Sequence, residues 1–300
     1  MEEAGAYAAR PVSNQLGCPR LPPPWRALFR ATPYMNYKLA FPTYRNRFRF
    51  VREGLTGYYA DQKAALALNL GTGEGDYDHM IAPFCERLIS CDINEADIAF
   101  AKDLNKELTN TSYQIEDALA LSFPDNHFDL ITSVDVLEHV GRPSQMIKEI
   151  GRVLKPGGRA FLTFPQLYFP VTYDPVNRIL SYVTNSKLTQ GAYAFGHEYL
   201  ITREAFIKWA EQEGLTVVRE KNLSGYLVGL TEMYWPGLLQ RIFKANATNL
   251  QSAGAKSRAL RPSTKEPLIV KATDVLIDVD HSLFGKSKYS VGKGFVVEKK

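Results

Sequence analysis

Short apolar runs alternate with amphipathic stretches over residues 65–165, and this rhythm predicts strands with helices between them. Buried strands are predicted by the apolar runs at 65–70, 87–91, 113–115, 128–134 and 159–163. Helices are predicted by apolar residues at helical spacing over 77–86, 95–108 and 142–154. Strands that alternate with helices favour a parallel sheet with right-handed crossovers. The predicted fold class is therefore a doubly wound, Rossmann-like α/β domain with a mostly parallel sheet.

The rhythm stops after Pro165 and returns with a predicted helix over 202–213, capped by Thr202 and ended by Gly214. A sixth strand is predicted at 215–219, and residues 294–297 predict a closing antiparallel edge strand. We expect four segments along the chain: a partly disordered basic and aromatic arm at 1–58, the ligand-binding core at 59–165, a cap segment that completes the sheet at 166–221, and an insertion with the final edge strand at 222–300.

Composition narrows the class of protein. The 300 residues are 45% apolar and 23% charged, which is typical of a folded chain. No apolar stretch approaches the ~20 residues that span a bilayer, and the N-terminus lacks the apolar core of a signal peptide. Cys18, Cys85 and Cys91 are too few and too irregularly spaced for a disulfide framework or a zinc site. We therefore expect a cytoplasmic protein without a bound metal.

Charge is distributed unevenly. Residues 61–165 carry a formal charge of −8, whereas the flanking residues carry +12. A basic arm beside an acidic core could meet a phosphorylated substrate, a membrane surface or nucleic acid, or it could be a solvated face. No RNA-binding module accompanies the arm, so nucleic acid is the disfavoured partner. The oligomeric state stays open.

A glycine-rich loop follows the first predicted strand, in Leu68-Asn69-Leu70-Gly71-Thr72-Gly73-Glu74-Gly75. Glycine lets the backbone turn sharply there and lets a ligand approach main-chain atoms. Asp92 ends the second strand, where a carboxylate can accept the hydroxyl groups of a ribose, and Glu116-Asp117 ends the third. These strand ends lie along one edge of a parallel sheet, which predicts a site for an adenosine-containing ligand.

Residues 59–165 resemble the class I S-adenosylmethionine-dependent methyltransferases, in particular the group that includes the ubiquinone-biosynthesis methyltransferases. The resemblance rests on Asn69–Gly75, Leu88–Asp92, Glu116–Asp117, Phe123–Asp129, Asp135–Val140 and the turn Leu154–Arg159. It implies that Gly71, Gly73 and Gly75 surround the methionine part of S-adenosylmethionine, that Asp92 binds the ribose and that Asp117 binds the adenine amine. The expected cofactor-binding set is completed by Asn69, Thr72, Ile93, Ala118 and Asp135.

One residue departs from that pattern. The family usually has Asp or Glu at the position of Asn69, and an amide brings no charge toward the sulfonium and ammonium groups of the cofactor. A non-catalytic relative that binds an adenosyl ligand is therefore an alternative. A nicotinamide-dependent oxidoreductase is disfavoured, because Asp76 stands where its fingerprint needs glycine and would repel a pyrophosphate. The missing Gly-Lys-Ser/Thr disfavours a phosphate-binding P-loop.

The predicted reaction is methyl transfer to a small-molecule acceptor, lipid- or sugar-linked, at oxygen; RNA methylation is kept as an alternative. Transfer to a hydroxyl group needs a general base, for which His197 and His139 are the candidates. Aromatic residues over 164–199 could line the acceptor pocket or form the core of a cap. The apolar stretch 226–243 could make a peripheral membrane contact or form a buried helix or a dimer contact.

Overall fold

The computed structural model describes residues 37–166, 201–229, 268–287 and 290–300, together with the single positions 179, 182, 183 and 231. The chain divides into two compact units, Met1–Arg30 and Ala31–Lys300, and every described residue belongs to the second. Most of the predicted arm, His197, nearly all of the aromatic segment after Pro165 and residues 232–267 of the insertion lie outside the described residues.

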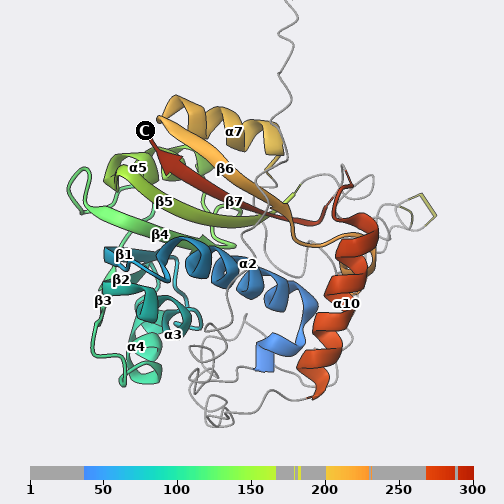
Figure 1. Cartoon of the computed structure of the whole chain (residues 1–300). Coiled ribbons are helices and arrows are strands. Elements are labelled where there is room, and N and C mark those ends of the chain that lie inside the picture. Colours follow the sequence, from blue (N-terminus) through green and yellow to red (C-terminus); the bar gives the residue numbers. More distant parts are fainter. Residues whose placement is uncertain are drawn as a thin grey trace, which may run out of the picture. The chain divides into compact units, whose positions relative to one another are not determined.

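A seven-stranded sheet forms the centre of the second unit, with the order β3-β2-β1-β4-β5-β7-β6 (Figure 1). The strands are β1 (Ala64–Leu70), β2 (Cys85–Asp92), β3 (Thr111–Ile115), β4 (Phe128–Val134), β5 (Leu154–Pro165), β6 (Leu215–Asn222) and β7 (Gly292–Lys299). Strands β1 to β5 pair in parallel, and β7 is antiparallel to both of its neighbours. This arrangement confirms the predicted doubly wound, mostly parallel α/β fold.

The antiparallel last strand is confirmed, but its place in the sheet differs from the prediction. Strand β7 lies between β5 and β6, so β6 forms the edge of the sheet. The reason is burial: residues 292–297 are all buried, and a strand covered on both faces belongs inside a sheet. Phe295 pairs with Leu162 of β5 on one side and with Glu220 of β6 on the other.

The helices are η1 (Tyr37–Ala40), α2 (Pro42–Tyr59), α3 (Asp78–Ile81), η2 (Ala82–Phe84), α4 (Glu95–Leu104), α5 (Pro143–Val153), α7 (Arg203–Gln212) and α10 (Leu268–Phe284). The helix expected over 77–86 is wrong in length, because α3 ends at Ile81 and β2 already begins at Cys85. Pro83 explains the early end, since proline lacks a backbone N–H and restricts the residue before it. Thr202 caps α7 as predicted, accepting the backbone N–H of Ala205 at 3.2 Å.

Helices cover both faces of the sheet. One hydrophobic cluster joins α5 and α7 to the face that carries Leu66 and Leu68, and a second joins α2 and α3 to the opposite face. Residues 42–59, which the sequence places in the arm, form α2, whose Phe50 and Leu55 are fully buried. Gly54 allows this contact, because a Cβ there would lie 2.2 Å from the ring of Phe161. Helix α10 lies beside α2 (Figure 1).

Candidate cofactor and acceptor site

The glycine loop directly follows β1 and turns through three left-handed residues. Gly71, Gly73 and Gly75 have φ angles of +74°, +51° and +81°, a region that glycine adopts without strain. A Cβ at Gly71 would lie 2.3 Å from the side chain of Val136, and one at Gly75 would lie 2.8 Å from the side chain of Ala101. A Cβ at Gly73 would meet no described residue within 4 Å. Packing therefore requires Gly71 and Gly75, whereas the described residues leave space beside Gly73 that a ligand can use.

Asp92 fastens this loop to the end of β2. Its Oδ2 accepts the backbone N–H of Gly73 at 2.9 Å, and its Oδ1 accepts that of Asn94 at 3.0 Å. A carboxylate oxygen has two lone pairs, so each oxygen can accept a further hydrogen bond from a ligand. Next to it, the side chain of Ile93 is 69% exposed and offers an apolar surface. The structure thus brings the predicted ribose ligand Asp92 and Ile93 against the glycine loop.

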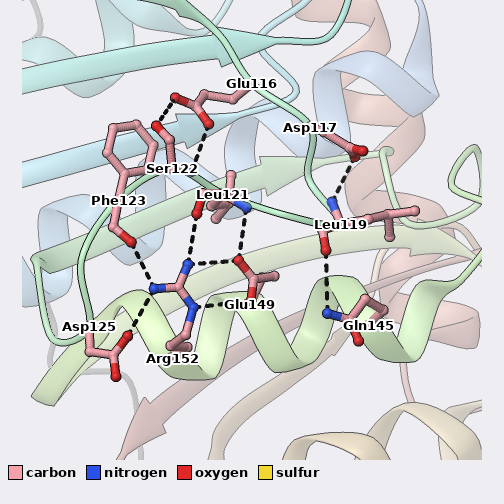
Figure 2. Close-up of polar contacts among 10 residues, drawn as sticks. All are labelled: Glu116, Asp117, Leu119, Leu121, Ser122, Phe123, Asp125, Gln145, Glu149 and Arg152. Atoms are coloured by element: carbon pink, nitrogen blue, oxygen red, sulfur yellow. Dashed lines mark hydrogen bonds and ion pairs between the residues drawn. The ribbon is translucent and has the colours of Figure 1, made fainter.

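The loop after β3 carries Asp117, and α5 holds this loop in place (Figure 2). Asp117 Oδ1 accepts the backbone N–H of Leu119 at 2.8 Å. Arg152 on α5 donates to the backbone carbonyl groups of Leu121 and Phe123 at 2.9 and 2.7 Å. Its hydrogen bond also holds the pKa of Glu149 below the usual range. The position of Asp117 at the predicted adenine end therefore depends on a helix about thirty residues further along the chain.

Ala118 is half-buried beside Asp117, and Glu116 turns away to bind Ser122 instead (Figure 2). On the other side of the glycine loop, the acidic residues Glu74 and Asp76 form ion pairs with Lys38 of η1. These ion pairs raise the pKa of Lys38 although its burial acts to lower it. A segment ahead of the core therefore balances part of the negative charge of the loop.

At the end of β4, Asp135 has a φ angle of +54°, which is strained for a residue with a side chain. It forms an ion pair with Arg47 of α2, and its Oδ1 accepts the hydroxyl of Thr163 at 2.9 Å. Arg47 is only 4% exposed. The sequence assigns Asp135 to the cofactor, and in this structure its partner is an arginine that sequence reasoning missed. The basic character of the arm was the available signal for Arg47.

Three further groups lie near this ion pair. Glu138 is wholly buried, and among the described residues neither of its carboxyl oxygens has a hydrogen-bond partner. Burial, together with the charge of Asp135, raises the pKa of Glu138 well above its usual value. The Nε2 atom of His139, whose side chain is 44% exposed, lies 4.0 Å from Glu138 Oε1. The buried hydroxyl of Tyr77 likewise has no hydrogen-bond partner in the described part of the chain. Sequence reasoning gave no role to Tyr77.

The described residues contain no candidate metal site and no candidate membrane span. Within them, no group of three or more His, Cys, Asp and Glu side chains could hold a metal ion. No described helix is long and apolar enough to cross a membrane. Cys85 and Cys91 are buried free thiols, and Cys18 lies outside the described residues.

The sheet order and the glycine loop at its carboxyl edge form a doubly wound fold with a ligand site where such folds bind their ligands. Residues 68–162 match the family model described as a methyltransferase domain. The chain is therefore an S-adenosylmethionine-dependent methyltransferase, and the class predicted from its sequence is confirmed.

Two groups of relatives match this chain. A ubiquinone biosynthesis O-methyltransferase of Coxiella burnetii is 28% identical over 174 residues, which are 57% of this chain and 70% of the relative. A ubiquinone/menaquinone biosynthesis C-methyltransferase of Hydrogenovibrio crunogenus is 38% identical over 100 residues, which are 31% of this chain and 39% of the relative. One relative is named for transfer to oxygen and the other for transfer to carbon, so the similarity does not choose the acceptor atom.

Solved structures show the same fold. The [4+2]-cyclase SpnF has a TM-score of 0.53 at 16% identity, covering 84% of this chain and 81% of the cyclase. A protein of Galdieria sulphuraria, provisionally named a sarcosine dimethylglycine methyltransferase, has a TM-score of 0.53 at 18% identity, with 83% and 85% covered. The first is named as a cyclase, so the fold by itself does not fix the reaction.

Proposed function

We propose that this chain transfers the methyl group of S-adenosylmethionine to an oxygen atom of a small-molecule acceptor. The cofactor binds along the ends of β1, β2 and β3, and the acceptor binds at the ends of β4 and β5. The observation that carries the proposal is the glycine loop, which is hydrogen-bonded to Asp92 and in which no described residue fills the space beside Gly73. Bound there, S-adenosylmethionine supplies an activated methyl group on a sulfonium centre.

The residues proposed for the cofactor all belong to the set predicted from the sequence, but Asp135 of that set is now proposed for the acceptor side. Gly71, Thr72 and Gly73 present main-chain atoms at the loop, while Asp92 and Ile93 face the ribose and the adenine ring. Asp117 and Ala118 bind the far edge of the adenine. Support comes from the arrangement of the loop after β3, which Arg152 fixes through two backbone carbonyl groups.

The acceptor side is proposed from the polar groups near Asp135. Arg47 and Asp135 form the floor that orients the acceptor, and His139 removes the proton from its hydroxyl group. Glu138, whose pKa burial raises well above its usual value, lies behind His139. His197 remains a second candidate for the base, although it lies outside the described residues. A buried carboxyl without a hydrogen-bond partner among the described residues is costly, which supports a role in contact with bound ligand or with His139.

The names of the relatives suggest the first acceptors to try. One relative is named for O-methylation in ubiquinone biosynthesis, so a dihydroxylated aromatic ring, with and without an isoprenoid tail, is the probe set. A tail that increases kcat/KM would support a lipid-linked acceptor and contact with a membrane surface. A sugar-linked phenol and a short RNA serve as the competing classes.

The test separates binding from transfer. Calorimetry of the full chain with S-adenosylmethionine, S-adenosylhomocysteine and NAD should show micromolar binding of the first two and none of the third. Mass spectrometry of the acceptors then detects a gain of one methyl group on oxygen. Preferential binding of NAD would overturn the cofactor assignment, and methylation of RNA alone would overturn the acceptor class.

A further inference from the structure

Four polar side chains lie in one row across the middle of the sheet. Asn69 of β1 pairs with Thr132 of β4 and with Ser90 of β2, and Ser90 in turn pairs with Tyr113 of β3. Paired residues on neighbouring strands point to the same face of a sheet. Asn69, Ser90 and Thr132 are buried, although the strands around them are otherwise largely apolar. Such a row needs a polar partner on the face that it lines.

That partner is Asp78, in the first turn of α3. The Asp78 side chain is wholly buried and accepts hydrogen bonds from several surrounding elements. The donors are Ser90 Oγ at 2.7 Å, Asn69 Nδ2 at 2.8 Å, Tyr113 OH at 2.9 Å, Thr72 Oγ1 at 3.1 Å and Asn105 Nδ2 at 3.4 Å. Strands β1, β2 and β3, the glycine loop and the end of α4 thus meet at one carboxyl group.

The donor set is typical of an ionised carboxylate. A carboxylate only accepts hydrogen bonds, and a buried one is stable only when donors surround it. The pKa of Asp78 lies above its usual value, because the effect of burial exceeds that of the hydrogen bonds from Asn69, Ser90, Tyr113 and Thr72, which act to lower it. The amide of Asn69 is fixed in orientation, because its Oδ1 accepts the hydroxyl of Thr132 at 3.1 Å.

Two side chains, Thr72 and Asn105, connect Asp78 to the glycine loop by hydrogen bonds. Thr72 Oγ1 donates to it directly from within the loop. Asn105 Nδ2 contacts Asp78 and also donates to the carbonyl oxygen of Gly75 at 3.0 Å. Moving or neutralising this carboxylate therefore changes both ends of the loop at once.

We propose that Asp78 is the positioning residue of the glycine loop and the buried negative charge behind the cationic groups of the cofactor. Asn69, at the end of β1, orients this carboxylate but contributes no charge of its own. The proposal rests on the proposed function, in which the loop binds S-adenosylmethionine.

A charge effect can be separated from a structural effect by comparing two ligands. S-adenosylmethionine carries a sulfonium charge, whereas S-adenosylhomocysteine has the same shape without that charge and without the methyl group. A buried anion attracts the first more strongly than the second, because attraction between charges is only weakly screened inside a protein. A purely structural role would affect both ligands equally.

The experiment measures the dissociation constants of both ligands by calorimetry for the wild-type chain, Asp78→Asn and the matched control Ser90→Ala. Asp78→Asn should weaken binding of both ligands and should change their ratio by about 3- to 10-fold against S-adenosylmethionine. Ser90→Ala removes one donor but keeps the charge, so its ratio should stay within about twofold of wild type. Circular dichroism reports whether each variant is folded.

The swap variant Asn69→Asp/Asp78→Asn keeps one carboxylate and one amide, with their positions exchanged. It should fold and should return the ratio to within about threefold of wild type. A swap variant that stays unfolded, or an Asp78→Asn ratio equal to that of wild type, overturns the proposal. If Asp78→Asn does not fold, the swap variant alone decides. Failure of the wild-type chain to bind either ligand would instead overturn the proposed function.

Discussion

Asp78 and Glu138 are both wholly buried carboxylic side chains near the carboxyl edge of the sheet, but their surroundings differ. Asp78 receives hydrogen bonds from five side chains. Neither carboxyl oxygen of Glu138 has a partner among the described residues. Burial raises the pKa of both groups, but only Asp78, beneath the glycine loop, is surrounded by donors that act to lower it again.

This difference separates the two sides of the site. On the cofactor side, the sheet and the loop satisfy the buried charge before any ligand binds. Near β4, Asp135 is strained, and the buried polar atoms of Glu138 and Tyr77 have no hydrogen-bond partner among the described residues, which is unfavourable for folding. Unsatisfied polar groups of this kind concentrate where a protein binds or transforms a ligand. The comparison therefore predicts opposite responses to mutation on the two sides.

The largest expected effect is on the side of Asp78. Asp78→Asn should lower the free energy of unfolding by about 2–4 kcal/mol at pH 7. The new amide NH2 group would face side chains that themselves donate hydrogen bonds, so both sides would lose a partner. Urea unfolding followed by circular dichroism measures the change. Ser90→Ala, which removes one of the five donors, should cost about 1 kcal/mol. Equal stability of Asp78→Asn and wild type would mean that this carboxylate is not an anion.

Glu138→Gln should act in the opposite direction. The folded pKa of Glu138 lies above its unfolded value, so the folded protein keeps a proton that the unfolded chain releases. Stability is therefore lost as the pH rises from about 4.3 through the folded pKa. Glu138→Gln should be more stable than wild type by about 1–3 kcal/mol at pH 8 and nearly equal at pH 4, and it should methylate more slowly.

Urea unfolding of Glu138→Gln and wild type at about pH 4 and about pH 8 checks this prediction. The stability difference between the two proteins should be larger at the higher pH than at the lower. Glu149→Gln is the contrasting variant, because Arg152 lowers the pKa of Glu149. Its folded pKa lies below the unfolded value, so Glu149 contributes stability at neutral pH that disappears as the pH falls. A loss of stability in Glu138→Gln at pH 8 would contradict the raised pKa of Glu138.

A smaller effect on cofactor affinity is expected at Arg152 of α5, which holds the loop after β3. Arg152→Met removes the hydrogen bonds to the carbonyl groups of Leu121 and Phe123 but keeps the aliphatic part of the side chain. Because Arg152 is partly exposed, water replaces some of these bonds, and the cofactor affinity should fall by about 1 kcal/mol, or about fivefold. Calorimetry measures this loss. Arg142→Met, at the exposed start of α5, is the control and should bind like wild type.

Some of these features could be predicted from the sequence. The strands β1, β4 and the core of β5 were predictable because buried parallel strands are continuous apolar runs. The glycine loop and Asp92 were predictable because their chemistry is local and follows strand ends. Asp78 was not, because its donors come from three strands that only the register of the sheet brings into one row. Arg47 was not, because its pairing with Asp135 depends on how α2 packs across the sheet.

The smallest effect should come from Arg47, and it tests where the acceptor binds. Arg47→Lys keeps the charge beside Asp135 but loses the planar group that can make several hydrogen bonds. We expect the KM of the acceptor to rise about three- to fivefold, or roughly 1 kcal/mol, while the dissociation constant of S-adenosylmethionine stays within about twofold. Initial rates at varied acceptor concentration, with the cofactor saturating, measure the first quantity.

Arg49→Lys is the matched control, since Arg49 lies on the same helix but forms its ion pairs with Asp274 and Asp278 of α10. It should change neither constant beyond about twofold, because lysine keeps the charge and these partly exposed ion pairs lie with α10 and not with Asp135. A loss of cofactor affinity in Arg47→Lys with an unchanged acceptor KM would place Asp135 on the cofactor side, as its sequence position first suggested. The end of β4 would then belong to the preformed half of the site, and the acceptor would have to be bound by segments after Pro165.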